Sequence, residues 1–209
     1  MKAGLCLAAL LISTAAAAQS SRPGPYVLDL RGVTGGAPSG AGFYPVVAPG
    51  TIVPKRGFGV GLGMHLYPFQ LGVARIGIGV DAMRTRGTST TPAVTGSTAA
   101  TSTFASDAKM DVTSVAGQVS FNFGGRDGWS YLSAGYGNIR TRGEVSSDVL
   151  GPIQHSVVVL KQHSPAINYG GGARWFLREH MAVGFDVRFH RMSNPSKQIV
   201  GLSVGVSLR

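Results

Sequence analysis

The feature that most constrains this chain is a strict alternation of large apolar residues with small or polar ones. From Phe58 to Leu66 every second residue is large and apolar, and the residues between them are glycines and one histidine. The same alternation returns over 183–190 and 200–208. Because successive side chains of a strand point to opposite faces, each stretch predicts a strand with one apolar face and one small or polar face.

Composition limits how such strands can be used. The 209 residues include 31 glycines, 44% hydrophobic residues and only 13% charged residues, which is unusual for a soluble globular protein. Beyond the first eighteen residues, no stretch has the roughly 18 consecutive apolar residues of a membrane-spanning helix. A closed barrel is the other structure that satisfies every backbone polar group in a bilayer. We therefore expect a transmembrane β-barrel whose apolar face contacts lipid.

The N-terminus predicts a secretory signal peptide. Lys2 gives a short basic start, residues 3–15 form an apolar run, and Ala16 and Ala18 make an A-x-A cleavage site before Gln19. The expected organisation is a signal peptide over 1–18, a short lead over 19–24 and a barrel domain over 25–209. The only cysteine, Cys6, lies in the signal peptide, so the mature chain is expected to have no disulfide and no cysteine metal site.

Alternation and turn residues together predict about eight strands. Their expected ranges are 26–32, 57–67, 74–85, 110–123, 129–139, 166–177, 182–191 and 198–208. Long connections over 33–56, 86–109 and 140–165 alternate with short ones, and the long ones are rich in Ser, Thr, Gly and Pro. Outer-membrane barrels have short periplasmic turns and longer external loops. We expect mobile external loops in these three connections and both termini in the periplasm.

The fifth of these strands leaves its phase open. Trp129 and Tyr131 indicate one outward set, whereas Leu132, Ala134 and Tyr136 indicate the other, so a bulge over 129–139 is an alternative to a regular strand.

Residues 168–176 read Asn-Tyr-Gly-Gly-Gly-Ala-Arg-Trp-Phe, and a short turn separates them from the alternation over 183–191. In this arrangement the chain resembles the small eight-stranded outer-membrane barrels of the OmpA and OmpX type, over nearly the whole mature chain. The resemblance implies an all-β, eight-stranded antiparallel up-and-down barrel in the outer membrane of a Gram-negative bacterium. It also implies periplasmic chaperones and the barrel-assembly machinery as partners. Family members commonly end on an aromatic residue, whereas this chain ends Leu208-Arg209.

Aromatic residues gather near the strand ends that carry the short turns. An aromatic girdle at the membrane interface would place them there, and ordinary core aromatics are the alternative. The residues are Tyr26, Tyr67, Phe69, Phe121, Phe123, Trp129, Tyr131, Trp175 and Phe176.

Basic residues gather at the opposite end, and the formal net charge is +10. Arg and Lys pair well with phosphate oxygens, so we predict a basic rim that contacts outer-membrane lipid and lipopolysaccharide. A solvated ring of charge is the alternative. The residues that map to this end are Arg31, Lys55, Arg56, Arg84, Arg86, Lys109, Arg140, Arg142, Lys161, Arg191 and Lys197.

The polar face of the strands predicts the barrel interior. An eight-stranded barrel is just wide enough for side chains to fill, so we expect a structural polar network and not an open porin. Ion pairs of Asp81 or Asp186 with Arg174 or Arg188 are expected. The inward set is Asp29, Arg31, His65, Arg75, Asp81, Gln118, Asn122, Asn168, Arg174, Asp186, Arg188 and His190.

No catalytic, cofactor-binding or metal-ligating residues are predicted. Residues 188–194 look like the H-x-S-N segment of the lipid A deacylases, but Arg191 stands where that family has its His, and His190 is one place off. An arginine stays protonated and cannot activate Ser193 as a base. The chain is therefore expected to be a non-enzymatic structural or surface-interaction protein whose loops carry any specific binding, with a lipid A-modifying enzyme as a less favoured alternative.

A second alternative is a soluble lipocalin-like barrel that binds a small hydrophobic ligand inside. It requires the apolar face to point inward, which would leave a glycine-rich outer surface bare, so the lipid-facing arrangement is preferred. Nucleic acid is not an expected partner, because the basic residues follow a rim and no recognition helix is present.

Overall fold

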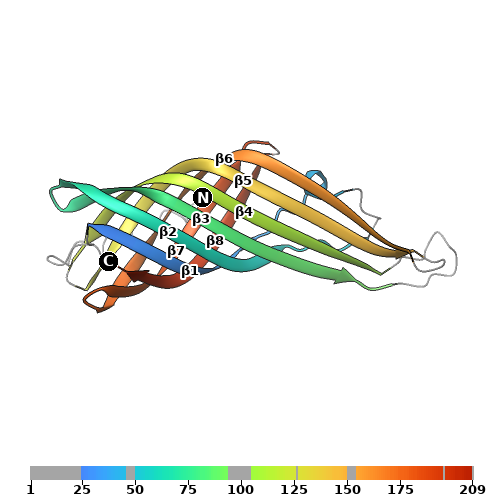
Figure 1. The fold of residues 1–209 in the computed structure, drawn as a ribbon, viewed down its shortest axis with the longest axis horizontal. Coiled ribbons are helices and arrows are strands. Elements are labelled where there is room, and N and C mark those ends of the chain that lie inside the picture. The colour runs from blue at the N-terminus through green and yellow to red at the C-terminus, as the bar shows by residue number, and fades with distance from the viewer. Residues whose placement is uncertain are drawn as a thin grey trace, which may run out of the picture.

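The structure is a computed structural model that describes residues 25–45, 50–93, 105–125, 127–149, 154–194 and 196–208. The predicted signal peptide and lead lie outside the described residues. Within them the chain forms eight strands and one short 3-10 helix, η2 (Ala41–Phe43) (Figure 1). The strands are β1 (Tyr26–Gly36), β2 (Arg56–Leu71), β3 (Ala74–Thr91), β4 (Ser106–Gly124), β5 (Gly128–Val149), β6 (Gln154–Arg178), β7 (Met181–Met192) and β8 (Lys197–Leu208).

These strands close into a barrel. Each pairs antiparallel with its neighbour in sequence, and β8 pairs with β1 from Leu28↔Leu208 to Gly35↔Gly201. The predicted fold class, an eight-stranded antiparallel up-and-down barrel, is confirmed. No helix within the described residues is long and apolar enough to cross a membrane.

The short turns lie at one end of the barrel, together with the start of β1 and the end of β8. One of them connects β2 to β3 through Gly72, whose φ of +56° lies in the left-handed region that favours glycine. We call this the turn end and the opposite end the loop end. Register shifts interrupt the pairing only near the turns, between Leu66 and Phe69 and between Phe176 and Arg178.

The strands β2 to β6 are each at least five residues longer than expected. β3 to β6 have 18 to 25 residues, whereas β1, β7 and β8 have 11 or 12. Their outer parts form one sheet that extends past the barrel wall, on the right in Figure 1. Gly87, Met110, Gly143 and Leu160 lie opposite one another in the strand pairing. We define the projecting sheet as this row and the residues between it and the outer strand ends, namely 87–91, 106–110, 143–149 and 154–160.

The expectation of loops over the whole of 86–109 and 140–165 is therefore wrong, because β3 continues to Thr91, β4 begins at Ser106, and β5 and β6 pair as far as Val149 and Gln154. The inner faces of these extensions bury Ala108, Met110 and Val145, and Thr91 and Ser106 are buried there as well. A hairpin outside a membrane can be polar on its outer face, so polarity alone did not distinguish it from a loop.

The alternating faces point as predicted over the barrel wall. Leu28, Leu62, Leu132 and Val204 belong to a continuous apolar surface outside, and each has more than 40% of its surface exposed. The phase of β5 is regular: Trp129, Tyr131 and Ser133 point inward, Leu132, Ala134 and Tyr136 point outward, and the pairing to both neighbours is unbroken over 128–139. This arrangement excludes the soluble alternative, in which the apolar face would point inward.

The expected aromatic girdle is partly wrong. Tyr26, Phe69, Phe121 and Trp175 are exposed outside, but Trp129 and Tyr131 are buried in the lumen. There they form a turn-end plug with Val27 and Ala182, against which Tyr67 and Phe176 pack, and the Trp129 and Phe176 ring centroids are 5.2 Å apart. A position near a strand end does not reveal which face an aromatic side chain occupies; that depends on the phase of the whole strand.

Candidate functional site

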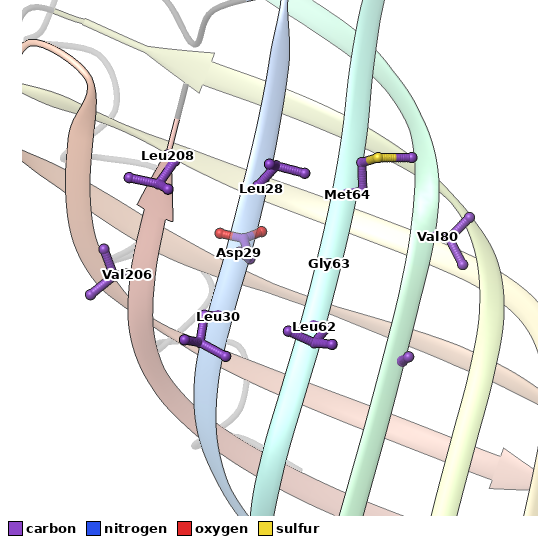
Figure 2. Close-up of a pocket in the computed structure, with 10 residues that line it drawn as sticks. Leu28, Asp29, Leu30, Leu62, Gly63, Met64, Val80, Val206 and Leu208 are labelled. Atoms are coloured by element: carbon purple, nitrogen blue, oxygen red, sulfur yellow. The ribbon is translucent and has the colours of Figure 1, made fainter.

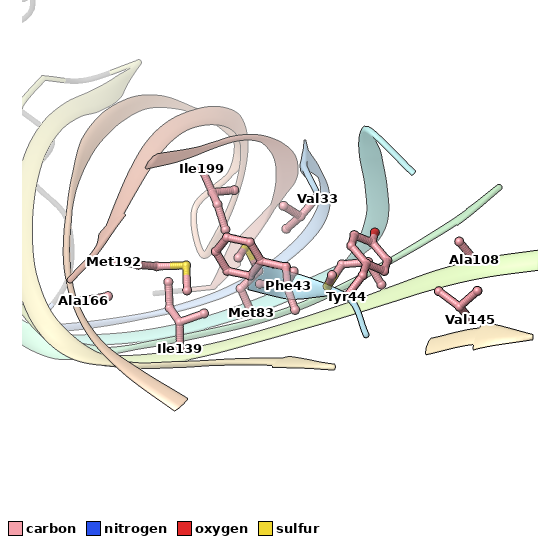
Figure 3. Close-up of a cluster of buried hydrophobic side chains, with 12 residues drawn as sticks. Val33, Phe43, Tyr44, Met83, Ala108, Ile139, Val145, Ala166, Met192 and Ile199 are labelled. Carbon is pink, nitrogen blue, oxygen red and sulfur yellow. The ribbon is translucent and has the colours of Figure 1, made fainter. Parts of the chain in front are cut away.

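The loop end of the lumen is closed by an apolar cluster that the sequence did not predict. Phe43, the last residue of η2, and Tyr44, which follows it, fold back into the barrel mouth and pack among inward side chains of seven strands (Figure 3). We call this the outer plug; its buried members are Val33, Phe43, Tyr44, Met83, Ala108, Met110, Val112, Ile139, Val145, Ala166, Met192 and Ile199. The connection between β1 and β2 is thus a fixed lid over described residues 37–45.

Polar contacts hold this lid in place. The Phe43 N–H donates to the Gly40 carbonyl at 3.0 Å, and the Gln162 Nε2 donates to the Gly42 carbonyl. The Ala37 N–H donates to the Lys55 carbonyl at 2.9 Å. Burial raises the pKa of the Tyr44 phenol, so that side chain stays protonated.

Between the two plugs lies a balanced set of charges, three arginines and three aspartates, which we call the lumen network: Asp29, Arg31, Asp81, Arg174, Asp186 and Arg188. Asp186 lies at its centre: its Oδ2 is 3.2 Å from Arg188 Nη2 and 3.7 Å from Arg31 Nη1, and it accepts a hydrogen bond from the Tyr131 hydroxyl. All six side chains are 10% exposed or less. Buried charges require this pairing because an unpaired charge away from water is strongly unfavourable.

The remaining pairs differ in part from the expectation. Arg31 pairs with Asp81, and Arg174 Nε lies 3.4 Å from Asp29 Oδ1. Arg174 thus pairs with neither Asp81 nor Asp186 among the described residues. His65, Gln118, Asn122, Asn168 and His190 are buried inside as well, while Arg75 is half-buried near the turn end.

Inward glycines make the room that these long side chains need. An ideal Cβ on Gly184 would lie 2.7 Å from Arg174 Cδ, and one on Gly63 would lie 3.3 Å from Asp29 Oδ2. The glycines therefore lie on the inner face, where the long charged side chains leave no room for larger residues.

Basic residues border the apolar wall on the outer faces of β3 to β6. Strand pairing aligns Arg84, Thr113, Arg140 and His163 in one row. The next outward-facing row, toward the loop end, is Arg86, Asp111, Arg142 and Lys161, followed by Thr88, Lys109, Glu144 and Val159. We call the six cations of these rows the basic collar: Arg84, Arg86, Lys109, Arg140, Arg142 and Lys161.

Two carboxylates neutralise part of the collar. Asp111 Oδ1 lies 3.8 Å from Arg84 Nη2 and 3.3 Å from Arg86 Nε. Glu144 lies 3.7 Å from Lys109 Nζ and 3.3 Å from Arg142 Nη2. Within the described part of the chain, Arg140 and Lys161 pair with no carboxylate. Cations thus outnumber carboxylates by six to two on these rows.

Not every predicted rim residue joins the collar. Arg31 was mapped to the rim as well as to the lumen, and it is buried in the lumen, so its rim placement is wrong. Arg56 is exposed on β2, two residues from Phe58, and Phe58 lies opposite Arg86 in the pairing with β3. Lys55, next to Arg56, is also exposed. Arg191 is exposed on β7 opposite Ile167 and Gln198, and Lys197 is exposed at the start of β8.

Nearer the turn end, where β8, β1, β2 and β3 meet, the outward side chains of the wall are apolar. Figure 2 shows the side chains that line an apolar hollow there. The hollow has a volume of about 520 Å³. Its outward side chains are Leu28, Leu30, Leu62, Met64, Val80, Ala82, Val206 and Leu208. Such a surface suits lipid acyl chains.

The described residues contain no cluster of three or more His, Cys, Asp or Glu side chains that could hold a metal ion. His190 points into the lumen, and neither of its ring nitrogens has a hydrogen-bond partner there. Ser193 is exposed in the turn beyond β7. Of the residues that resembled a deacylase segment, His190 thus lies inside the barrel, and Ser193 lies in a turn beyond the strands.

Comparison with known proteins identifies this architecture. The family model for the outer membrane protein beta-barrel domain matches residues 4–207. The chain belongs to this family. It is accordingly an integral protein of the outer membrane of a Gram-negative bacterium, with strands as its membrane-spanning segments. No curated protein is significantly similar in sequence.

Solved structures share the fold at low identity. Neisserial surface protein A (NspA) has a TM-score of 0.51 and 15% identity, over 88% of this chain and 97% of that protein. Ail of Yersinia pestis, solved alone and with the heparin analogue sucrose octasulfate, has a TM-score of 0.50 and 11% identity, over 88% of this chain and 95% of its own. OprG of Pseudomonas aeruginosa has a TM-score of 0.50 and 10% identity, over 88% and 94%. At these identities the likeness is one of fold.

Proposed function

We propose that this protein is a non-enzymatic outer-membrane barrel whose basic collar binds the phosphate groups of lipopolysaccharide in the surrounding outer leaflet. The observation that carries the proposal is the excess of cations over carboxylates on the outer faces of β3 to β6. Phosphate oxygens are strong acceptors for arginine, which can bind them through two parallel N–H groups.

The depth of the collar fits a lipid headgroup. Along β3 the outward side chains change from Val80 and Ala82 to Arg84 and Arg86, and along β6 they change from Ile167 to His163 and Lys161. The change from apolar to cationic marks the edge of the hydrocarbon layer, where headgroup phosphates begin. The cations therefore lie beside phosphates and not beside acyl chains.

The spacing of the collar determines where on it a phosphate group can bind. Arg84 and Arg86 are two residues apart on one strand, about 7 Å, and β5 lies two strand spacings from β3, about 10 Å. Arg140 and Arg142 occupy the far side of this area. The four guanidinium groups thus surround Thr113 and Asp111. Asp111 already pairs with Arg84 and Arg86, and Glu144 pairs with Arg142, so the positive charge available to an added phosphate is greatest at Arg140 and Lys161.

Lipopolysaccharide that co-purifies with the barrel tests the proposal. We expect the double variant Arg84→Glu/Arg140→Glu to retain less than half of the lipopolysaccharide per barrel that the wild type retains. Arg178→Glu is the matched control, because Arg178 is exposed at the turn end of β6. Each variant must first show the heat-dependent gel shift of a folded barrel. Equal retention by the double variant and the wild type would refute a lipid-binding collar.

A sulfated glycan is the second candidate ligand, and it shares the anionic chemistry. The Ail structure with sucrose octasulfate motivates this arm. Heparin-agarose retention of the lipid-free barrel in neutral detergent measures it. If the double variant loses heparin retention but keeps its lipopolysaccharide, the collar serves a soluble polyanion instead of the membrane.

A further inference from the structure

A small cavity lies in the lumen where the lumen network meets the outer plug. Val33 and Met83, which Figure 3 shows in the outer plug, line it together with two arginines and two aspartates of the network. Its volume is about 10 Å³, which is room for about one sphere the size of a water molecule. Any molecule or ion that binds in this cavity is therefore very small.

Four buried side chains that line the cavity have polar atoms without a hydrogen-bond partner among the described residues. Arg188 pairs with Asp186 through Nη2, but its Nε and Nη1 have no partner. Arg31 Nε, Ser203 Oγ and both ring nitrogens of His190 have none either. Each of these four residues is 6% exposed or less. Buried polar groups without a partner are costly, so a cluster of them around one cavity indicates a bound ligand.

The unpartnered atoms are almost all hydrogen-bond donors. Arginine nitrogens only donate, a serine hydroxyl can donate, and a histidine ring has at least one N–H. The carboxylates that line the cavity accept hydrogen bonds already, Asp81 from Arg31 and Asp186 from Arg188. Neither carboxylate has a buried oxygen without a partner in the described part of the chain. The cavity therefore needs an acceptor that the described side chains do not supply.

The number of donors and the size of the cavity limit what this acceptor is. A water molecule has two lone pairs, so it accepts from two of these donors and leaves the others unpaired. A spherical anion accepts from every direction, and hydrogen bonds from arginine to an anion are stronger than those between neutral groups. Phosphate, sulfate and carboxylate ions have several heavy atoms and exceed the room of one water molecule. A monatomic anion satisfies both conditions.

Gly201 leaves the space for this ion. It faces inward on β8, opposite Arg188 of β7 and Gly35 of β1, and it lines the cavity. An ideal Cβ on Gly201 would lie 3.8 Å from its nearest neighbour, the Arg188 carbonyl oxygen. An ideal Cβ on Gly184 would instead clash with the backbone of β6. The lumen is therefore less crowded beside Arg188 than around Gly184.

We propose that this cavity holds a single resident halide ion, chloride under physiological conditions, which accepts hydrogen bonds from the unpartnered donors of the lining. The arginines and aspartates of the lining carry equal and opposite charge, so the ion is bound by the donors that the carboxylates leave free. The turn-end plug and the outer plug close the lumen on both sides. The ion therefore enters during folding and exchanges slowly afterwards. This site is independent of lipid binding by the collar, whose exposed charges exchange their counterions freely with solvent.

Bromide tests the proposal, because it resembles chloride in charge and size and scatters X-rays anomalously. The chain is unfolded in urea, refolded into detergent micelles in sodium bromide and then transferred to sodium acetate by gel filtration. We expect elemental mass spectrometry to find one retained bromide per folded barrel. Crystals of the same material should show an anomalous peak between Arg188, His190 and Ser203.

Gly201→Ala is the decisive variant, because its methyl group occupies part of the cavity without a clash. We expect it to retain at least fivefold less bromide than the wild type. Gly36→Ala is the matched control: no atom lies within 4 Å of its added Cβ, and Gly36 does not line the cavity. It should retain as much bromide as the wild type. The heat-dependent gel shift verifies that both variants fold.

Ser203→Ala tests the donors separately from the space. It removes one hydroxyl from the lining, and we expect the retained bromide to fall at least twofold. Ser133→Ala is the control, because Ser133 Oγ is also buried and unpartnered among the described residues but Ser133 does not line the cavity. Ser133→Ala should retain as much bromide as the wild type.

Three results would overturn the proposal. The first is a folded wild-type barrel that retains no bromide, which would exclude a resident ion. The second is electron density in the cavity without an anomalous signal, because the ligand would then be water. The third is equal retention by the wild type, Gly201→Ala and Ser203→Ala, since the bromide would then be bound elsewhere on the protein.

Discussion

Neutralising Asp186 should destabilise the barrel more than any surface change of the same kind. Asp186→Asn keeps the size of the side chain and an acceptor for the Tyr131 hydroxyl, but it removes the charge that Arg31 and Arg188 share. The side chain of Asp186 is 2% exposed, so the two arginines gain no compensating water. Removing one partner of a buried ion pair costs about 3–5 kcal/mol, and we expect a loss of unfolding free energy in that range.

Equilibrium urea unfolding in detergent micelles, followed by tryptophan fluorescence, measures this loss. Trp129 is a suitable reporter because it is buried in the turn-end plug beside Tyr131. The control is Asp107→Asn, an exposed aspartate on the projecting sheet that accepts a hydrogen bond from Thr90, where a change within about 0.5 kcal/mol is expected.

A second substitution tests whether charge balance is the cause. Arg188→Met combined with Asp186→Asn leaves two arginines and two aspartates in the lumen network, so the double variant should regain about 2 kcal/mol relative to Asp186→Asn. If Asp186→Asn lost less than about 1 kcal/mol, or if removing Arg188 gave no recovery, the lumen charges would not depend on one another as the geometry implies.

Two further predictions concern space in the lumen and the outer plug. Gly184→Ala should lower the unfolding free energy by about 1–3 kcal/mol, because its Cβ would clash with the Ala173 carbonyl oxygen and would lie 2.7 Å from Arg174 Cδ. Gly36→Ala should have little effect, because no atom lies within 4 Å of its added Cβ. Urea unfolding compares the two variants, and equal losses would contradict the crowding argument. Phe43→Ala should open the outer plug and increase the rate of maleimide labelling of a Met83→Cys reporter at least tenfold, while the gel shift of the folded barrel persists. Ile52→Ala, at an exposed residue, is the control. Unchanged labelling in Phe43→Ala would mean that Phe43 does not hold the lid.

Alternation in the sequence predicted most of the fold. A period of two, sustained over the barrel wall, determines strand identity and face together, so the eight strands and their lipid-facing residues followed from it. The inward charges followed as well, because a charged residue on the face opposite Leu28 or Leu62 has no other place in a membrane barrel. The choice of partners did not follow: Arg174 pairs with Asp29, 145 residues away, and that depends on the register of the closed barrel.

The outer ends of the barrel were less predictable for a different reason. Outside the bilayer a hairpin and a loop can have the same polar composition, so the length of β5 and β6 depends on pairing between strands and not on the pattern within either. The lid likewise carries a local signal, Phe43 and Tyr44, but only the three-dimensional arrangement shows that they enter the barrel mouth. Large aromatic residues inside a connection that was expected to be a solvated loop are the signal that could have indicated it.

The two apolar plugs have a consequence for how the molecule responds to its surroundings. Dissolved ions screen exposed charges beyond about 10 Å at 0.1 M salt, but they screen charges that they cannot approach much less. The lumen network lies between the plugs, out of reach of mobile ions, whereas the basic collar lies in full contact with them. The protein therefore carries two sets of ion pairs of different sensitivity to salt: raising the ionic strength should weaken the proposed phosphate binding by the collar and leave the ion pairs of the lumen network unchanged.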